Sequence, residues 1–250
     1  MQCILLAAGY ATRLYPLTEN MPKALLPLGD RTILDMVVDK INAVEEVEII
    51  YIVTNDKFFQ CFCDWAKQYQ GSKNIRVLND HTTANSNRLG AIGDLKYVID
   101  QENIDDDILV MASDNIFGFP LTDFVDAYKK HHADMICAHI IKDPKELHSM
   151  GVVELDAQHK VLSFEEKPAE PKSDLGVPPF YLYRRETLPL LRQYLDEGNN
   201  PDAPGHFIPW LITKQDVYAH VFDAMRIDIG TIESYHEACR LQESGQLFKA

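Results

Sequence analysis

The stretch that decides the fold opens the chain: Leu6-Ala7-Ala8-Gly9-Tyr10-Ala11-Thr12-Arg13-Leu14, then Pro22-Lys23-Ala24-Leu25-Leu26-Pro27. The apolar run from Ile4 to Ala7 predicts a buried strand that ends at small residues. Backbone N–H groups in such a turn suit phosphate oxygens, and the cations Arg13 and Lys23 can neutralise a polyphosphate. The glycines of a dinucleotide fingerprint and the Gly-Lys-Ser/Thr of a Walker loop are missing. The segment therefore predicts a phosphate site of another kind after the first strand.

Outward from this turn, short buried-strand runs alternate with helix-period runs up to about residue 140. Strands are predicted at 49–53, 75–78, 108–112 and 134–141, and helices at 33–41, 58–69, 91–99 and 124–128. The run 49–53 is too continuously apolar for a half-exposed strand, so it predicts a central parallel one. The alternation favours an α/β fold, with a central, mostly parallel sheet flanked by helices.

After residue 150 the rhythm changes. The segments 152–155 and 161–164 flank a polar turn and predict a hairpin. Further strands are expected at 180–183, 217–222 and 225–229, and helices at 186–195, up to 210 and at 232–241. No Pro/Gly/Ser-rich linker separates the halves. We therefore expect a single domain over 1–250, with one half at about 1–140 and a smaller, more antiparallel half at about 141–250.

The charge balance narrows the class of protein. The 250 residues hold 24 Lys and Arg against 38 Asp and Glu, for a net charge of −14. So acidic a chain is a poor candidate for binding nucleic acid or a membrane surface. No apolar run approaches the roughly 20 residues that span a bilayer, and the five scattered cysteines are not a disulfide framework. We expect a cytoplasmic protein that acts on small molecules.

Two aspartates occupy positions suited to a metal. Asp114 follows the apolar run 108–112, which places it at the carboxyl end of a central strand, where open α/β sheets bind ligands. Asp228 follows a similar run at 225–227. Two carboxylates converging on one site suit Mg²⁺, which needs few protein ligands when phosphates supply the rest. Taken singly, each aspartate also fits a turn or capping role.

The opening stretch resembles the signature of sugar-1-phosphate nucleotidyltransferases (nucleoside-diphosphate-sugar pyrophosphorylases), among them the glucose-1-phosphate thymidylyl- and uridylyltransferases. Four later segments match in family order: Ala112-Ser113-Asp114-Asn115-Ile116-Phe117, Gly151-Val152-Val153, Ser163-Phe164-Glu165-Glu166-Lys167-Pro168 and Ile227-Asp228-Ile229-Gly230-Thr231. Together they cover nearly the whole chain. The resemblance implies a Rossmann-like nucleotidyltransferase fold, with the first half for the nucleotide and the second for the sugar phosphate.

The resemblance also implies roles for individual residues. The nucleotide would lie against Leu6, Ala7, Ala8, Gly9, Tyr10, Ala11 and Thr12, with Asn85 and Gly90 near the base. Glu166 would hold sugar hydroxyls and Lys167 the sugar phosphate, whereas Glu165 is expected to be a solvated charge. Arg13 would bind the β- and γ-phosphates and Lys23 the α-phosphate region, and Asp114 and Asp228 would hold Mg²⁺. The expected catalytic residues are Arg13, Lys23, Asp114, Lys167 and Asp228.

The implied reaction joins a nucleoside triphosphate to a sugar-1-phosphate. A phosphate oxygen of the sugar attacks the α-phosphorus in line, and pyrophosphate leaves. Because the second pKa of such a phosphate is about 6, the nucleophile is already an anion and needs no general base. Positioning and charge neutralisation would then supply the catalysis.

Some positions depart from the family pattern. Ala8 and Ala11 replace glycines, and an alanine does not readily hold a positive φ. Pro178-Pro179 stands where hexose enzymes show Thr-Gly, and His206 stands near a position usually filled by Glu. The acceptor is therefore open between a hexose phosphate, a heptose phosphate and a phosphorylated alcohol such as choline or inositol phosphate.

Three other functions stay open. The same scaffold serves as a cytidylyltransferase for a phosphorylated alcohol, although Glu166-Lys167-Pro168 favours a sugar. A non-catalytic paralogue that senses nucleotide sugars would have lost active-site charges, which this chain retains. A glycosyltransferase would need Asp-x-Asp after the central strand, where this chain has Asp114-Asn115-Ile116. The base and the oligomeric state are not readable from the sequence.

Overall fold

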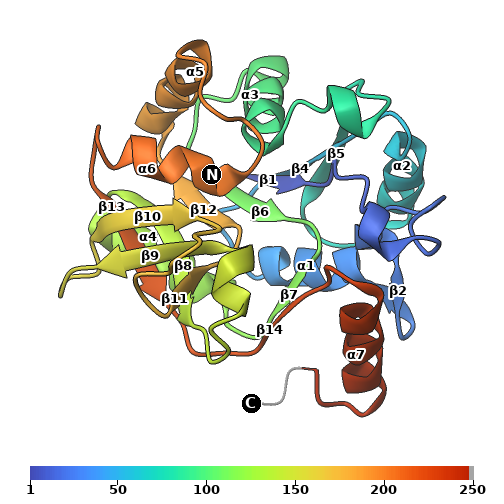
Figure 1. Cartoon of the computed structure of the whole chain (residues 1–250). Helices are drawn as coiled ribbons and strands as arrows, with labels where there is room; N and C mark the ends of the chain where they lie inside the picture. Colours follow the sequence, from blue (N-terminus) through green and yellow to red (C-terminus); the bar gives the residue numbers. More distant parts are fainter. Residues whose placement is uncertain (248–250) are drawn as a thin grey trace. The chain divides into compact units, whose positions relative to one another are not determined.

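The structure, a computed structural model, describes residues 1–247, which form two compact units built from interleaved segments. We call the first the parallel unit: it comprises residues 2–88, 112–121 and 224–247. The second, the antiparallel unit, comprises residue 1, residues 89–111 and residues 122–223. Figure 1 shows the elements along the chain, coloured from the N-terminus to the C-terminus.

The parallel unit is built around the strand order β1-β4-β5, in which both pairings are parallel. Two small antiparallel pairs, β2 with β3 and β7 with β14, complete its strands. Its elements are β1 (Gln2–Leu6), β2 (Pro27–Leu28), β3 (Arg31–Thr32), α1 (Ile33–Asn42), β4 (Ile49–Thr54), α2 (Phe59–Gln68), β5 (Asn74–Asn79), β7 (Asn115–Phe117), β14 (Arg226–Asp228) and α7 (Ile232–Glu243), with the 3₁₀ turns η1 (Thr12–Leu14), η2 (Lys23–Leu25) and η3 (Asn85–Asn87).

Local sequence signals explain these elements. The strand β4, which is almost wholly buried, lies between β1 and β5, as its continuous apolar run predicts. Helix α1 begins with a capping box: the Thr32 hydroxyl accepts from the Asp35 N–H, and the Asp35 carboxylate accepts from the Thr32 N–H at 2.7 Å. Helix α7 begins with the same device at Thr231 and Ser234.

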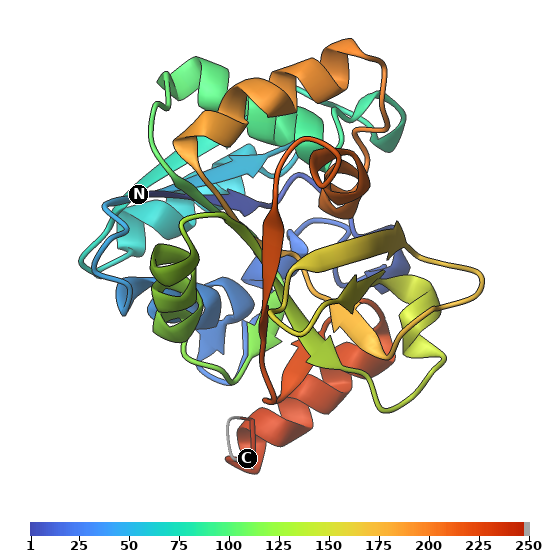
Figure 2. The same ribbon diagram turned by 90° about the vertical axis from the view of Figure 1, so that its left-hand side faces the viewer.

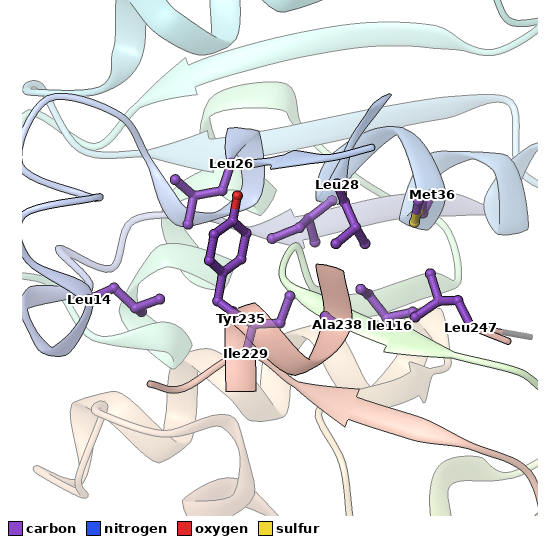
Figure 3. Close-up of a cluster of buried hydrophobic side chains, with 10 residues drawn as sticks. Leu14, Leu26, Leu28, Met36, Ile116, Ile229, Tyr235, Ala238 and Leu247 are labelled. Atoms are coloured by element: carbon purple, nitrogen blue, oxygen red, sulfur yellow. The ribbon is translucent and has the colours of Figure 1, made fainter. Parts of the chain in front are cut away.

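A buried cluster ties the C-terminal segment of the parallel unit to its N-terminal part (Figure 3). Tyr235, near the start of α7, lies between Leu26 and Ile229, and its hydroxyl donates to the Pro27 carbonyl at 2.6 Å. The members of the cluster are Leu14, Leu26, Leu28, Ile33, Met36, Ile116, Ile229, Tyr235, Ala238 and Leu247. Side chains from all three segments of this unit therefore share one core.

In the antiparallel unit the strand order is β10-β9-β11-β8-β12-β6, with every pairing antiparallel, and β13 pairs parallel with β8 (Figure 2). Its elements are α3 (Ala91–Glu102), β6 (Ile108–Ala112), α4 (Leu121–His131), β8 (Asp134–Ile140), β9 (Gly151–Leu155), β10 (Val161–Glu166), β11 (Leu175–Val177), β12 (Phe180–Tyr183), α5 (Leu188–Asp196), α6 (Phe207–Leu211) and β13 (Val217–Val221), with the 3₁₀ turns η4 (Glu146–Ser149), η5 (Arg185–Thr187) and η6 (Pro204–His206).

A buried carboxylate stabilises this unit from within. Asp134, at the start of β8, accepts hydrogen bonds from the Arg184 N–H at 2.8 Å, the Thr187 hydroxyl and the Gln215 amide. Burial raises the pKa of this carboxyl group, and the donors oppose that shift. Through these hydrogen bonds Asp134 links β8 with η5 and with Gln215, which precedes β13. Both oxygens of the carboxylate accept hydrogen bonds.

The elements expected from the sequence are present, and the α/β class is confirmed. The structure adds β2, β3, β7 and β11, which the sequence did not predict, and it pairs the predicted strand at 225–229 with β7. The single domain over 1–250, its two halves divided near residue 140, and the cytoplasmic location stay predictions. Within residues 1–247, the helices are all too short or too polar to cross a bilayer.

Candidate active site

The turn after β1 is held by its carbonyl groups. The Ser113 N–H and hydroxyl donate to the Leu6 carbonyl at 3.2 and 2.9 Å. The Thr54 hydroxyl donates to the Ala7 carbonyl, and the Asn55 amide donates to the Ala8 carbonyl at 2.9 Å. The end of β4 and the residue after β6 therefore fix the path of the turn, leaving its N–H groups to face elsewhere.

The N–H groups of this turn form a consecutive unengaged run. Within the described residues, 1–247, no backbone N–H from Ala8 to Arg13 donates a hydrogen bond, whereas Ala7 and Leu14 on either side both do. A Cβ built on Gly9 would meet no protein atom within 4 Å. Unpaired backbone donors beside open space are what a chain of phosphate oxygens requires.

Ala11 has a positive φ, although we expected that an alanine would not readily hold one. Its φ of 47° lies in the left-handed region, which costs an alanine about 1–2 kcal/mol. Two hydrogen bonds hold the residue there, because its carbonyl accepts from the Thr18 hydroxyl at 2.7 Å and from the Leu14 N–H at 3.0 Å. The backbone thus takes the conformation that a glycine would adopt without strain.

Lys23 brings the two predicted aspartates together. Its Nζ lies 2.8 Å from Oδ2 of Asp114 and 3.8 Å from Oδ1 of Asp228, so these two oxygens are within about 7 Å of each other. The pairing of β7 with β14 explains the approach, because Asp228 lies opposite Asn115. Three residues from three distant segments of the sequence therefore form one charged cluster.

The electrostatics of the cluster keep Lys23 positively charged. Burial acts to lower its pKa, but the adjacent charges of Asp114 and Asp228 outweigh burial, and the pKa is raised. Arg13 acts on the same group in the opposite direction, so its charge also reaches the cluster. The ammonium group neutralises one of the two carboxylates, and the neighbouring turn offers donors to an anion.

The donor set fits Mg²⁺ bound together with phosphates. Hard carboxylate oxygens suit this ion, and one or two protein carboxylates suffice when a nucleotide supplies the other ligands. Groups of three or more His, Cys, Asp or Glu side chains able to hold a metal by themselves do not occur within residues 1–247. The carboxylates of Asp114 and Asp228 fit a Mg²⁺ ion whose remaining ligands would come from bound phosphates.

Two residues of this cluster escaped the sequence analysis. The Asn115 amide donates to Oδ1 of Asp114 at 3.2 Å, and its oxygen accepts from Arg226 at 3.0 Å. Asn115 thus orients one predicted metal ligand from the strand that pairs with the other. Its position directly after Asp114 was the available signal, but the register that brings in Arg226 is visible only in the fold.

The predicted sugar-phosphate residues lie in the antiparallel unit. Glu166 ends β10 opposite Gly151 of β9. Lys167 follows with a φ of 50°, and its N–H donates to the Met150 carbonyl at 3.0 Å. The neighbouring Glu165 forms an ion pair with Lys172 at the surface.

Glu166 is a partly buried acid and differs from Asp134 in its hydrogen bonding. Burial raises the pKa of its carboxyl group, while the charges of Lys167 and His206 act to lower it. Within residues 1–247, no group donates a hydrogen bond to the Glu166 carboxylate, whereas Asp134 receives several. A partly buried carboxylate without donors is suited to accept them from the hydroxyl groups of a ligand.

The two residues predicted near the base have other partners in the structure. Asn85 is exposed in η3, and its side-chain oxygen accepts from Arg88 at 3.0 Å. Gly90 has a φ of 80°, and a Cβ there would lie 2.5 Å from the Pro201 carbonyl oxygen. Gly90 is therefore required for the packing of its own unit, and the contact of either residue with a base stays a prediction.

Comparison with known proteins identifies the family and the fold of this chain. The model of the nucleotidyl transferase family matches residues 2–245, so the chain belongs to that family. A solved UDP-glucose pyrophosphorylase complexed with UDP-glucose matches the structure with a TM-score of 0.81 and 18% identity over 98% of both chains. This match confirms the predicted nucleotidyltransferase fold.

Curated proteins also match most of this chain. Glucose-1-phosphate adenylyltransferase 1 of Vibrio parahaemolyticus is 26% identical over 94% of this chain and 64% of its own length. The bifunctional protein GlmU of Methanocaldococcus jannaschii is 28% identical over 77% of this chain and 42% of its own length. The chain thus spans less than two thirds of the length of these relatives.

Proposed function

We propose that the protein is a Mg²⁺-dependent nucleotidyltransferase that condenses a nucleoside triphosphate with a sugar-1-phosphate to give a nucleoside-diphosphate sugar and pyrophosphate. The observation that carries this proposal is the run of unengaged N–H groups from Ala8 to Arg13 in the same unit as the Lys23–Asp114–Asp228 cluster. Donors, a buried cation and two carboxylates are the parts that a triphosphate with its metal requires.

The residues of the parallel unit would hold the triphosphate. The N–H run would bind phosphate oxygens, and Arg13, exposed at η1, would neutralise the β- and γ-phosphates that leave. Lys23 would exchange its contact with Asp114 for the α-phosphate, where negative charge develops in the transition state. Mg²⁺ held by Asp114 and Asp228 would supply further neutralisation of the phosphates.

The residues of the antiparallel unit would hold the acceptor. The carboxylate of Glu166 would accept hydrogen bonds from vicinal hydroxyls, and the ammonium group of Lys167 would pair with the acceptor phosphate. The attacking oxygen belongs to that phosphate, which is already ionised at neutral pH because its second pKa is about 6. No group of the protein is required to remove a proton.

The test is release of pyrophosphate with Mg²⁺ from a matrix of nucleoside triphosphates against sugar-1-phosphates and phosphorylated alcohols. Asp114→Ala and Lys167→Ala are compared with Asp64→Ala and Lys67→Ala, two exposed residues that pair with each other on α2. We expect one productive pairing, which both site variants abolish and both control variants preserve.

The other outcomes are equally decisive. Turnover of a phosphorylated alcohol alone would replace the sugar by that acceptor class. Binding of a nucleotide sugar without turnover of any pairing would make the protein a sensor rather than an enzyme. Full activity in Asp114→Ala would contradict the metal site.

A further inference from the structure

The segment from Asn200 to His206, which belongs to the antiparallel unit, is fixed at both ends by one side chain. The Tyr194 hydroxyl on α5 lies 2.8 Å from the Asn200 carbonyl oxygen and 3.2 Å from the His206 carbonyl oxygen. Tyr194 itself is buried against the rings of Phe207 and Trp210. The two ends of the segment therefore have little freedom to separate.

The middle of the segment is fixed to α3. The Ala91 N–H donates to the Asp202 carbonyl at 3.1 Å, and the Ile92 N–H donates to the Pro201 carbonyl at 2.9 Å. These two donors are otherwise unpaired groups at the start of a helix, so the segment acts as the cap of α3. Gly90 permits this approach because it lacks a Cβ.

The far end of the segment presses on β10. A Cβ built on Gly205 would overlap Oε2 of Glu166 and lie 3.0 Å from the ring of Phe164. Gly205 has no positive φ, so backbone conformation alone does not call for a glycine there. On the other side, a Cβ on Gly151 would also overlap the Phe164 ring. The absence of a side chain at Gly205 is what leaves Glu166 its present position.

We propose that Gly205 is a positioning residue for the acceptor, in that the fixed 200–206 segment presents a bare backbone against which the Glu166 carboxylate is set. The inference rests on the proposed function, because it takes Glu166 as the group that accepts from acceptor hydroxyls. The predicted acceptor class is one with a hydroxyl pair within reach of this carboxylate. Size at position 205 then controls the acceptor and leaves the nucleotide unaffected.

The 200–206 segment is held more firmly than the Glu166 side chain. The segment is held by Tyr194 and by the start of α3, so it cannot yield to an added methyl group without breaking these hydrogen bonds. Glu166 is the more mobile partner, because no group within residues 1–247 hydrogen-bonds its carboxylate. A methyl group at position 205 therefore displaces the carboxylate rather than the segment. Misplacement of a binding group by about 1 Å has large kinetic costs.

The experiment is a double-mutant cycle of Gly205→Ala and Glu166→Ala, read in two ways. The first reading is the KM for the acceptor found in the pyrophosphate assay, beside the KM for the nucleoside triphosphate. We expect Gly205→Ala to raise the acceptor KM about tenfold or more, to leave the nucleotide KM within twofold, and to add nothing in the Glu166→Ala background. Ala203→Ser, which adds one atom two residues away, is the matched control and leaves both constants unchanged.

The second reading is the urea midpoint of unfolding for the same four proteins, which needs no activity. Gly205→Ala lowers the midpoint in the native background and much less when Glu166 is already alanine, because the truncated side chain leaves room for the methyl group. If Gly205→Ala alone does not fold, the double variant still tests the contact. Equal losses in both backgrounds would overturn the contact.

The two readings separate this inference from the proposed function. Coupled unfolding midpoints in a protein that turns over no acceptor would remove the function and, with it, the role of Gly205 in acceptor binding. Normal turnover with an unchanged acceptor KM in Gly205→Ala would remove the inference and leave the function standing.

Discussion

The two units treat their buried charges in opposite ways. In the parallel unit, Lys23 lies between Asp114 and Asp228, and each charge has a partner. In the antiparallel unit, the partly buried Glu166 carboxylate receives no hydrogen bond from residues 1–247, and its pKa is raised by burial. The charges of the parallel unit compensate one another, whereas the Glu166 carboxylate would obtain hydrogen-bond donors only from a ligand or from water.

This difference indicates two modes of recognition. A triphosphate with its metal carries large charges of both signs, so a site for it must exchange existing ion pairs for new ones at low cost. A polyol is neutral and offers only hydroxyl groups, so its hydrogen bonds are most favourable with a carboxylate that has no donor in the protein. Asp134 shows that the antiparallel unit can satisfy a buried acid where the role is structural.

The largest effect is expected where the compensation is removed. Lys23→Met leaves two adjacent carboxylates without their cation, and it removes the positive charge that we propose acts on the α-phosphate. We expect kcat for pyrophosphate release to fall about 10²- to 10³-fold, the cost of losing one group that stabilises transition-state charge. Lys67→Met, on the surface of α2, serves as the control. A loss of less than fivefold would show that Lys23 serves the fold alone.

The structural acid of the antiparallel unit provides the next test. Asp134→Ala removes the acceptor of the Thr187 hydroxyl and the Arg184 N–H and one of the two acceptors of the Gln215 amide, and we expect the free energy of unfolding to fall by about 3 kcal/mol. Calorimetry measures the loss, and KM values of the folded fraction should not change. A change in the acceptor KM would show that Asp134 also affects acceptor binding.

Glu166→Gln should separate stability from binding. Because the folded pKa of Glu166 is raised, the folded state holds a proton that the unfolded state has lost, so stability falls as the pH rises from the unfolded pKa of about 4.3 through the folded value. The glutamine variant escapes this loss. We expect it to be more stable than the native protein in urea at pH 8, with equal stability near pH 4, and to bind the acceptor more weakly.

Glu165→Gln is the matched control for that experiment, since Glu165 pairs with Lys172 at the surface. It should show no gain at pH 8. A gain of equal size in both variants would attribute the effect to net charge rather than to the burial of Glu166.

The smallest effect concerns the backbone strain at Ala11 in the turn after β1. Ala11→Gly relieves the left-handed alanine, worth about 1–2 kcal/mol, and adds roughly 0.5–1 kcal/mol of chain entropy to the unfolded state. We expect a net gain of about 0.5 kcal/mol by chemical denaturation. Ala8→Gly, in the same turn but without a positive φ, should instead destabilise the protein. Loss of stability in both variants would contradict the strain at Ala11.

Local pattern was sufficient for most of the fold. The continuous apolar run of β4 and the capping box of Thr32 are legible in the sequence because they depend on neighbours in the chain. The meeting of Asp114 with Asp228 was expected from their two strand ends, and the structure shows it through Lys23. These features follow from short-range periodicity and from the rule that ligands meet strand ends.

Features that depend on register or on distant packing could not be predicted. Arg226 reaches Asn115 only because β14 pairs with β7 in one particular register. The sequence gives no sign that Gly205 faces Glu166, since nothing in the pattern of residues 200–206 specifies which strand they touch. Ala11 is left-handed against its own preference because Thr18, seven residues on, fixes its carbonyl.

The interleaved composition of the parallel unit has a consequence for its synthesis. Its core unites Leu14 and Leu26 with Ile229, Tyr235 and Leu247, which are translated long after them. The β4–β5 pairing can form early, but the strand that carries Asp228 and the helix that follows it are added only after residue 224 has been translated. The emerging chain must therefore keep an unfinished apolar surface in contact with solvent or with chaperones until these segments have been synthesised. Ribosome-bound chains arrested before residue 224 should be cleaved by protease in this unit, and release of the full chain should protect it.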